Sequence, residues 1–595
     1  MQVVYENANN ALTHLQTAEK LIGGQKFGLA AVELKFAEQK LTKSGEGLAI
    51  ASQASIFKNE LLNNQLNVAV EIIDIGKIIS RSLAEIVGVG AEVEAALKSD
   101  KIYWLAISAE KKKSVLQILY DSADDLEKAQ LDFHLAGAKL EAVNKKQPLF
   151  IFNKAVNPLR EKLPKMIKAF DQLVTAAKLL PAFAGYPEEK NYLILLENNR
   201  ELRPAGGFIG TYGVLKIKNA ELAKFFVDNS YNLDKPAEKF LKIEAPEPMK
   251  KYMKQEWWFF RDSNWWPDFA ASAKKAEEFY AAEGGKEKLD GVIALTPTVF
   301  EWLLGELGEM KVAGLKFNKD NFWEQLQYQV EYGYYKQGIP VEKRKDIVAE
   351  LAKLILTKLY FLPLDQWAGV FDLVGRAAEE KQLLVYFNDE KFQKMAEARD
   401  WAGAVKKFDG DFLMLVDANL AALKTDSVMS RTIKYKLTPS ADGALNVETK
   451  VEYQNLGDFS WKTTRYRSYS RLYAPAGSEL ISVEAGGKKV ETAEIDVYGE
   501  FGKTAFGVFF EVEPQTTKPI IWKYKLPPLV QETINDGEYR LMVQKQPGLL
   551  DLNLQLDLSF NKKIKNIGAG ALAGKKSLKH VEVLRQDQIY TVWLE

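Results

Sequence analysis

The chain has 595 residues, more than one hydrophobic core usually holds, so we expect roughly three to five domains. Its 80 lysines and arginines balance 80 aspartates and glutamates, and the lack of a basic excess argues against a nucleic-acid binder. Cysteine is absent, which excludes disulfides, thiolate catalysis and cysteine zinc sites.

The first third of the chain, residues 1–185, has the periodicity of helices. Apolar residues recur at helical spacing on both sides of Gly23-Gly24, which predicts an αα-hairpin that looks like a single tetratricopeptide-type pair. Further helices are expected over residues 46–97, 101–143 and 154–180, with breaks near 88–90, 99–100 and 147–148. We interpret this region as a helical bundle or stalk, with a partner-binding helix face as the alternative.

The middle of the chain, residues 190–405, mixes strand and helix patterns. Apolar, strand-like runs are expected at 192–196, 208–217, 257–260, 291–295 and 383–387. Helical runs are expected at 270–282, 297–307, 319–332 and 341–360. Strands that alternate with helices predict a sheet covered by helices, and therefore an α/β domain.

The last part, residues 410–595, is rich in short strands separated by turn residues. Strands are expected at 411–417, 429–437, 445–454, 468–473, 479–483, 504–512, 520–525, 537–544 and 554–559. Regular spacing of this kind predicts an immunoglobulin-like β-sandwich. The fold class expected for the whole chain is therefore multidomain: a helical bundle, then an α/β sheet domain, then a β-sandwich.

Residues 191–213 form the most informative segment, because a dense polar cluster follows an apolar strand directly. Pro204 and the Gly206-Gly207 pair then turn the chain, and a second polar segment lies at 259–269. Open α/β sheets bind ligands at the carboxyl ends of strands, and arginine pairs well with phosphate oxygens. The candidate ligand-binding residues are Asn198, Arg200, Arg203, Gly206, Gly207, Asn264 and Trp265.

Arg261 and Asp262 are the candidate catalytic residues in a phosphotransferase interpretation. Asp262, with Glu201 or Asp268, would hold a magnesium ion, which prefers oxygen ligands and substrate phosphates. The metal would neutralise a pyrophosphate leaving group, and a carboxylate would accept the proton of the attacking hydroxyl. No cofactor is evident otherwise, and magnesium enters only with this alternative.

A structural interpretation of the same cluster stays open. Glu197, Arg200, Glu201 and Arg203 could satisfy one another, because buried arginine–carboxylate pairs also pin loops to a domain. The tryptophan pairs at 257–258 and 265–266 fit either core filling or the lining of a sugar or lipid groove.

Several common chemistries are not expected. Neither GxxxxGK[ST] nor a strand followed by GxGxxG occurs, which disfavours nucleotide-binding loops of those types. His14, His134 and His580 lie in widely separated segments, so we expect neither a histidine metal site nor a Ser-His-Asp triad.

The motifs in residues 191–213, 259–269 (FFRDSNWWPDF), 289–308 (LDGVIALTPTVFEWLLGELG) and 411–426 (DFLMLVDANLAALKTD) resemble the domain-of-unknown-function family numbered 4012. The YAPAGSEL and WKYKLP segments, at 473–480 and 522–527, fit the same order, so the resemblance covers about 190–530. It implies a bacterial protein with an N-terminal membrane anchor and a large extracytoplasmic part.

The middle domain is also distantly similar in plan to the LytR–CpsA–Psr family, whose enzymes move polymers from polyprenyl-pyrophosphate carriers to the cell wall. Arg200 and Arg203 follow the first strand, and Arg261-Asp262 follow the second. Two positions depart from that family: the first strand ends in Glu-Asn-Asn instead of Gly-Ser-Asp, and Glu309 replaces the second glycine of the closing pair.

Together these observations predict an extracytoplasmic cell-surface protein of structural or interaction type, in envelope organisation or attachment. The alternative is a phosphotransferase or carrier-binding protein acting on polyprenyl-pyrophosphate-linked glycans. Expected partners are envelope components or further copies of the chain, with no nucleic acid. No apolar stretch reaches about 18 residues and no signal peptide is visible, so the membrane helix that the resemblance implies is absent from this chain.

Overall fold

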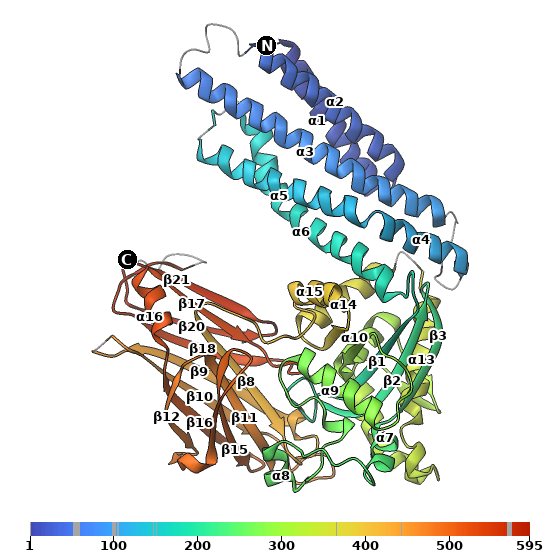
Figure 1. The fold of residues 1–595 in the computed structure, drawn as a ribbon, viewed down its shortest axis with the longest axis vertical. Helices are drawn as coiled ribbons and strands as arrows, with labels where there is room; N and C mark the ends of the chain where they lie inside the picture. Colours follow the sequence, from blue (N-terminus) through green and yellow to red (C-terminus); the bar gives the residue numbers. More distant parts are fainter. Residues whose placement is uncertain are drawn as a thin grey trace. The chain divides into compact units, whose positions relative to one another are not determined.

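The computed structural model describes residues 2–51, 60–97, 103, 106–146, 148–149, 152–363, 366–441, 443–567 and 574–595. The chain divides into two compact units (Figure 1). One contains residues 1–190 and 216–223, and the other contains 191–215 and 224–595. No helix of the described ranges combines the length and the apolar character needed to cross a membrane.

The first unit is a bundle of long helices, as the periodicity predicts (Figure 1). Its helices are α1 (Gln2–Gly23), α2 (Phe27–Ala51), α3 (Glu60–Leu97), α4 (Ala109–Asp121), α5 (Ala123–Lys145) and α6 (Asn153–Phe183). α1, α2 and α3 share an alanine- and leucine-rich core around Leu34. Phe133 of α5 stacks on Phe170 of α6 with ring centroids 4.2 Å apart. The tip of the β2–β3 hairpin joins this unit through an ion pair between Lys112 and Glu221, 2.7 Å long.

Two predicted details of the bundle are wrong. α3 continues through the expected break at 88–90, because Phe27 packs against Gly90 and buried Val87 contacts the same core, which outweighs a glycine cost of about 1 kcal/mol. The expected helix at 101–143 is two helices, since α4 ends at Asp121 and α5 begins after Ser122. The predicted break at 99–100, and Gln147 of the predicted break at 147–148, lie outside the described residues.

The second unit begins with a five-stranded mixed sheet in the order β3-β2-β1-β4-β7. The strands are β1 (Lys190–Asn198), β2 (Phe208–Lys218), β3 (Glu221–Asn229), β4 (Gly291–Leu295) and β7 (Leu383–Phe387). β1 and β4 are parallel, with Tyr192 opposite Gly291, so their carboxyl ends meet at the same edge; β7 is antiparallel to β4. Four of the five predicted strands are confirmed, and β3 is an addition.

Short and long helices accompany this sheet (Figure 1). They are α7 (Ser230–Ala237), α8 (Glu247–Met253), α9 (Phe269–Ala282), α10 (Pro297–Leu307), α11 (Phe322–Tyr328), α12 (Tyr334–Lys336), α13 (Asp346–Tyr360), α14 (Trp367–Glu379) and α15 (Glu390–Ala398). A small hairpin, β5 (Met310–Val312) and β6 (Leu315–Phe317), follows α10, and a π-helical turn, η5 (Gln329–Gly333), follows α11. The helices predicted at 270–282 and 297–307 are confirmed.

The strand predicted at 257–260 is wrong. Only Trp257 forms an isolated bridge, to Glu244, and Phe260–Asp262 form one 3-10 turn, η4. Single bonds and not a sheet satisfy this backbone: the Trp258 amide donates to the Ile243 carbonyl at 2.7 Å, and the Phe260 amide donates to Glu283 Oε1 at 2.8 Å. Trp258 Nε1 donates to the Asp262 carbonyl at 2.8 Å. The aromatic run reads as a strand because its rings are buried, but they fill the core from an irregular segment.

Two seven-stranded sheets form the predicted sandwich (Figure 1). One has the order β13 (Lys488–Lys489), β12 (Glu479–Ala485), β16 (Thr516–Lys525), β10 (Leu445–Asn455), β9 (Met429–Pro439), β18 (Leu552–Ser559) and β20 (Ser577–Leu584). The other has the order β14 (Ile495–Glu500), β15 (Lys503–Val512), β11 (Tyr466–Pro475), β8 (Asp411–Asn419), β17 (Glu538–Gln544), β21 (Gln588–Leu594) and β19 (Ile564–Ile567). Helix α16 (Pro528–Asn535) lies between β16 and β17.

One core joins the inner faces of the two sheets. Trp522 and Tyr435 from one sheet and Phe506 and Leu541 from the other are fully buried in it. All nine predicted strands are confirmed, and the fold class is as expected. Each sheet also contains one parallel pair, β8 with β17 and β9 with β18, which the strand pattern does not reveal.

Candidate ligand pocket at the carboxyl ends of the central strands

A cavity of about 510 Å³ lies where β1 and β4 end. Its wall includes Leu196–Asn198 from β1, Leu295 at the end of β4 and Pro297 at the start of α10. α11 and α13 supply further walls, and the loop after β8 contributes Leu423 and Lys424. The volume is within the usual range of small-molecule sites, and the position is the one at which open α/β sheets bind ligands.

One end of the cavity is lined by two of the three predicted arginines, Arg203 and Arg261. Arg203 is buried, and its Nη1 donates to the Asn419 carbonyl at 2.7 Å. Its Nη2 lies 3.5 Å from both Glu201 Oε1 and Asp262 Oδ1. A charge-assisted N–H···O bond is usually about 2.7–2.9 Å long, so this nitrogen is only loosely held by the protein.

Arg261 pairs with a second acidic group, which consists of Asp234 and Glu283. Its Nη1 donates to Asp234 Oδ2 at 2.6 Å, and its Nε lies 3.6 Å from Asp262 Oδ2. Asp234 is fully buried next to Glu283, and burial together with the Asp234 carboxyl raises the pKa of Glu283. The pair therefore carries about one negative charge, which balances the Arg261 guanidinium.

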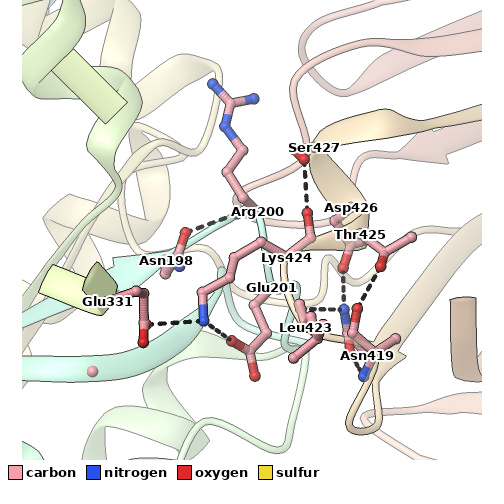
Figure 2. A network of polar contacts seen from close by, with 12 residues as sticks. Asn198, Arg200, Glu201, Glu331, Asn419, Leu423, Lys424, Thr425, Asp426 and Ser427 are labelled. Atoms are coloured by element: carbon pink, nitrogen blue, oxygen red, sulfur yellow. Dashed lines mark hydrogen bonds and ion pairs between the residues drawn. The ribbon is translucent and has the colours of Figure 1, made fainter. Parts of the chain in front are cut away.

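Two lysines complete the polar end. Lys345 Nζ donates to Asn229 Oδ1 at 3.0 Å and to the Gly210 carbonyl, and its burial, with Arg344 nearby, lowers its pKa to about 7. Figure 2 shows the Lys424 ammonium between Glu331 and Glu201, at 3.3 Å and 3.8 Å. Both lysines line the cavity.

Glu197 is the buried carboxyl of this region, and it also lines the cavity. It is buried, and burial raises its pKa well above the usual value, although Asn264 and the Gly207 backbone donate to it. Asn264 Nδ2 donates to Glu197 Oε1 at 2.9 Å and to the Gly207 carbonyl at 2.7 Å. A Cβ on Gly206 would lie 1.9 Å from Glu197 Oε2, so only glycine fits there.

The other end of the cavity is apolar. Its walls come from α10, α11 and α13, which pack together in one buried cluster. The lining side chains there are Phe300, Phe322, Leu326, Val330, Leu351 and Ile355. The cavity therefore has a polar end, which is lined by arginine and lysine, and an apolar end, which is lined by these six residues.

The structure brings some of the predicted site residues into the cavity and leaves others outside. Asn198, Glu201, Arg203, Arg261 and Asp262 line it. The predicted residues that do not line it are Arg200, Gly206, Gly207, Asn264, Trp265 and Asp268.

Each of the residues outside the cavity has a structural partner. Arg200 points away from Lys424 and Glu201 (Figure 2) and pairs with Glu301 at 3.5 Å. Trp265 packs between core residues, with Arg471 over its ring at 4.9 Å. Asp268 caps α9 by accepting from the Ala271 amide at 3.1 Å and also accepts from Val405.

The three carboxylates proposed for magnesium are not assembled in one place. Glu201 and Asp262 share the cavity, but Asp268 is committed to the start of α9. Among the described residues, no group of three or more histidine or acidic side chains is arranged to hold a metal ion.

The predicted mutual pairing of the 197–203 segment is confirmed only for Glu201 with Arg203. Glu197 pairs with Asn264, and Arg200 pairs with Glu301, each from another segment. Partners distant in sequence therefore satisfy these groups.

Sequence reasoning missed the lysines and the apolar end. Lys424 stands inside the conspicuous segment 411–426, but nothing in its spacing points to the cavity. Arg344 and Lys345 precede α13, and Lys345 reaches β2 across 135 residues of sequence. The sequence signal for this part of the cavity is the helical periodicity of α13. That periodicity predicts a buried face but does not show which residues the face contacts.

In comparisons with known proteins, a family model matches the central segment of the chain. No curated protein matches the chain. Solved structures match weakly: a Legionella pneumophila protein described as nutrient binding (10% identity, 31% of this chain and 71% of that one, TM-score 0.21) and leukotriene A4 hydrolase of Saccharomyces cerevisiae (6%, 28% and 29%, 0.18). An M1 zinc metallopeptidase of Deinococcus radiodurans matches similarly (7%, 29% and 43%, 0.15). These scores carry no argument about fold or function.

Residues 187–331 match the model of a family described as a protein of unknown function, DUF4012. The matched segment contains β1, β2, β4, α10 and the start of η5, and therefore most of the polar end of the cavity. The motifs at 411–426, 473–480 and 522–527 lie beyond it, and the similarity to the LytR–CpsA–Psr family is not shown. The family whose model matches residues 187–331 is thus the one that the motifs of the sequence resemble.

Proposed function

We propose that the cavity binds an amphiphile with an anionic head and a hydrocarbon chain, the class to which polyprenyl-phosphate carriers belong. The observation that carries the proposal is the union of a cationic end and an apolar end in one cavity. A polar metabolite would leave the apolar walls exposed to water, and a plain hydrocarbon would make no contact with the charged groups of the arginines and lysines.

The charges at the polar end favour an anion. Five basic side chains line the cavity against four carboxyls. Burial raises the pKa of one of these carboxyls, Glu197, well above its usual value, which weakens the negative charge of the cavity wall. Arg203 Nη2 is only loosely held, so an incoming oxyanion can replace long contacts with short ones.

The apolar end supplies affinity for the hydrocarbon chain of the ligand. Each methylene group that leaves water for such walls contributes about 0.8 kcal/mol, so ten methylenes contribute roughly 8 kcal/mol before the cost of immobilisation. The described walls of α11 and α13 can therefore account for most of the affinity, while the cations select the head group.

Binding is better supported than phosphoryl transfer. Asp262 Oδ2 accepts from Gln255 Nε2 at 3.0 Å and faces Arg261, while Oδ1 faces Arg203. Both oxygens are engaged with cationic or amide donors, which suits a residue that positions arginines more than a base for a substrate hydroxyl. A location in the cell envelope, with a structural or attachment role there, stays a prediction from the sequence.

Thermal unfolding with farnesyl diphosphate, farnesol and inorganic diphosphate tests the proposal. A ligand at 100 times its Kd stabilises the folded state by about 2.7 kcal/mol, so farnesyl diphosphate should raise Tm clearly and the two fragments much less. Leu351→Trp, which fills the apolar end, and Lys345→Met, at the polar end, should each reduce the shift.

Arg200→Met is the matched control, because Arg200 lies in the same loop but outside the cavity. It should leave the shift unchanged. No shift with farnesyl diphosphate, or a shift that survives both cavity substitutions, would contradict the proposal.

A further inference from the structure

An exposed aromatic surface adjoins the cavity. Tyr328, Tyr332 and Tyr335 follow one another at helical spacing across α11, η5 and α12, and all three are exposed. The loop between β10 and β11 adds Phe459 and Trp461. We call these five residues the aromatic rim.

The rim is one surface and not scattered side chains. The rings of Tyr332 and Trp461 meet edge to face with centroids 5.1 Å apart, which joins the helical part to the sandwich loop. Tyr335 is 81% exposed and Phe459 is 69% exposed, so both the helical part and the loop present a large ring to water. Contiguous apolar surface of this kind usually marks an interaction site.

Lysines stand beside these rings. Lys336 Nζ donates to the Tyr328 hydroxyl at 2.8 Å. Lys462 pairs with Glu324 at 2.8 Å and lies 5.5 Å from the centroid of the Trp323 ring. Tyrosine, tryptophan and lysine together are the residue types that settle at the boundary between lipid headgroups and acyl chains.

The rim is continuous with the cavity. Val330 and Glu331, which line the cavity, lie between Tyr328 and Tyr332 in the same stretch of helix. On the other side, the Lys424 amide donates to the Lys462 carbonyl at 2.9 Å, and Lys424 also lines the cavity. A molecule at the rim is therefore next to the cavity wall.

We infer that the aromatic rim docks onto the interfacial layer of a lipid bilayer, so that a lipid enters the cavity directly from the membrane. The inference rests on the proposed function, because that function gives the cavity a hydrocarbon chain to hold. Carrying such a chain through water costs about 0.8 kcal/mol for each exposed methylene. Contact between the rim and the bilayer reduces the number of methylene groups that are exposed to water during transfer. The aromatic rings of the rim also gain apolar contact with lipid.

Flotation on phosphatidylcholine–phosphatidylglycerol vesicles tests the inference. The whole chain should float, and the double variant Tyr335→Ser, Phe459→Ser should lose at least tenfold in vesicle partition. Phe240→Ser is the matched control, since Phe240 is 62% exposed but belongs to the α7–α8 connection; it should float like the unaltered chain. Failure of the unaltered chain to float, or flotation of the double variant at the same level, would overturn the inference.

The two proposals fail in different ways. The double variant should keep its Tm shift with farnesyl diphosphate in the absence of vesicles, because its cavity is intact. Leu351→Trp and Lys345→Met should float normally but lose that shift. Binding to vesicles that disappears in 0.5 M salt while surviving the double substitution would show a purely electrostatic contact and would also overturn the rim as the docking surface.

Discussion

Two arginine–carboxylate clusters in the second unit differ in how completely they are closed. In the sandwich, Arg431 binds Asp417 at 2.6 Å and Asp426 at 2.5 Å, and the Tyr466 hydroxyl accepts from it at 2.7 Å. At the ends of the central strands, Arg203 reaches its two carboxylates only at 3.5 Å.

The difference separates a structural clasp from a binding site. The Arg431 cluster is buried, its contacts are short, and none of its three charged members lines the cavity. The Arg203 cluster has long contacts, opens on the cavity and has lysines beside it. One arginine with two carboxylates thus serves two purposes, and the length of the ion pairs and the adjoining cavity distinguish them. Asn419 connects the two, since its carbonyl holds Arg203 and its amide donates to Asp426.

The largest expected effect comes from breaking the closed cluster. Arg431→Met should lower the free energy of unfolding by about 3–5 kcal/mol, because Asp417 and Asp426 would be left buried without their cation. Chemical denaturation measures the loss. A change under about 1 kcal/mol would show that the cluster is not the clasp that its short contacts indicate.

A substitution at the cavity should lower the free energy of unfolding less than Arg431→Met does, and it should weaken ligand binding. Arg261→Met leaves Asp234 beside Glu283, where the two carboxyls can share a proton, so we expect a loss of about 1–3 kcal/mol. The same variant should lose the Tm shift with farnesyl diphosphate. A stability loss equal to that of Arg431→Met, with the ligand shift retained, would remove the distinction between the clusters.

The acidic support of Arg261 should make stability depend on pH. Burial and Asp234 raise the pKa of Glu283 above its usual 4.5, so the folded chain keeps a proton that the unfolded chain loses. This contribution is complete below about pH 4.5 and declines as pH rises towards the folded pKa, by at most about 1.4 kcal/mol per pH unit.

Glu283→Gln should flatten that decline, since glutamine still accepts from the Phe260 amide and does not titrate. Unfolding measured between pH 5 and pH 8 for both chains gives the comparison. Parallel curves would show that the Asp234–Glu283 pair does not share a proton.

The smallest effect concerns Lys345. Its lowered pKa of about 7 means that an anion bound nearby draws a proton onto it, so affinity should fall as pH rises above 7, by at most tenfold per pH unit. Lys345→Met should bind more weakly at pH 7 and lose this dependence. Titration calorimetry at pH 7 and pH 8.5 measures both, and an equal pH dependence in the two chains would assign it to another group.

The sequence by itself determined the elements and much of the architecture. Apolar Ile433, Tyr435 and Leu437 alternate with polar residues, and these three side chains are buried in β9. The α10 segment starts at Pro297, which fits the first position of a helix, and the prediction matches both of its ends. Such signals are local, because period and end residues act within one turn or one strand.

Sequence also located the polar cluster near the end of β1, and five of its eleven candidate site residues line the cavity. It could not separate Arg203 from Arg200, three positions apart, because the side on which each guanidinium falls depends on Asn419 and Glu301. Nor could it foresee that the Phe260 amide of the aromatic run would donate to Glu283 instead of to a neighbouring strand.

Only the tertiary structure decided what the cavity is. Lys345 reaches Gly210, and Lys424 meets Glu201, across more than a hundred residues of chain. The apolar face of α13 became a cavity wall because α10 and α11 pack beside it. Long-range contacts of this kind depend on how the sheet, the helices and the sandwich come together, and a single sequence carries no local signal for that assembly.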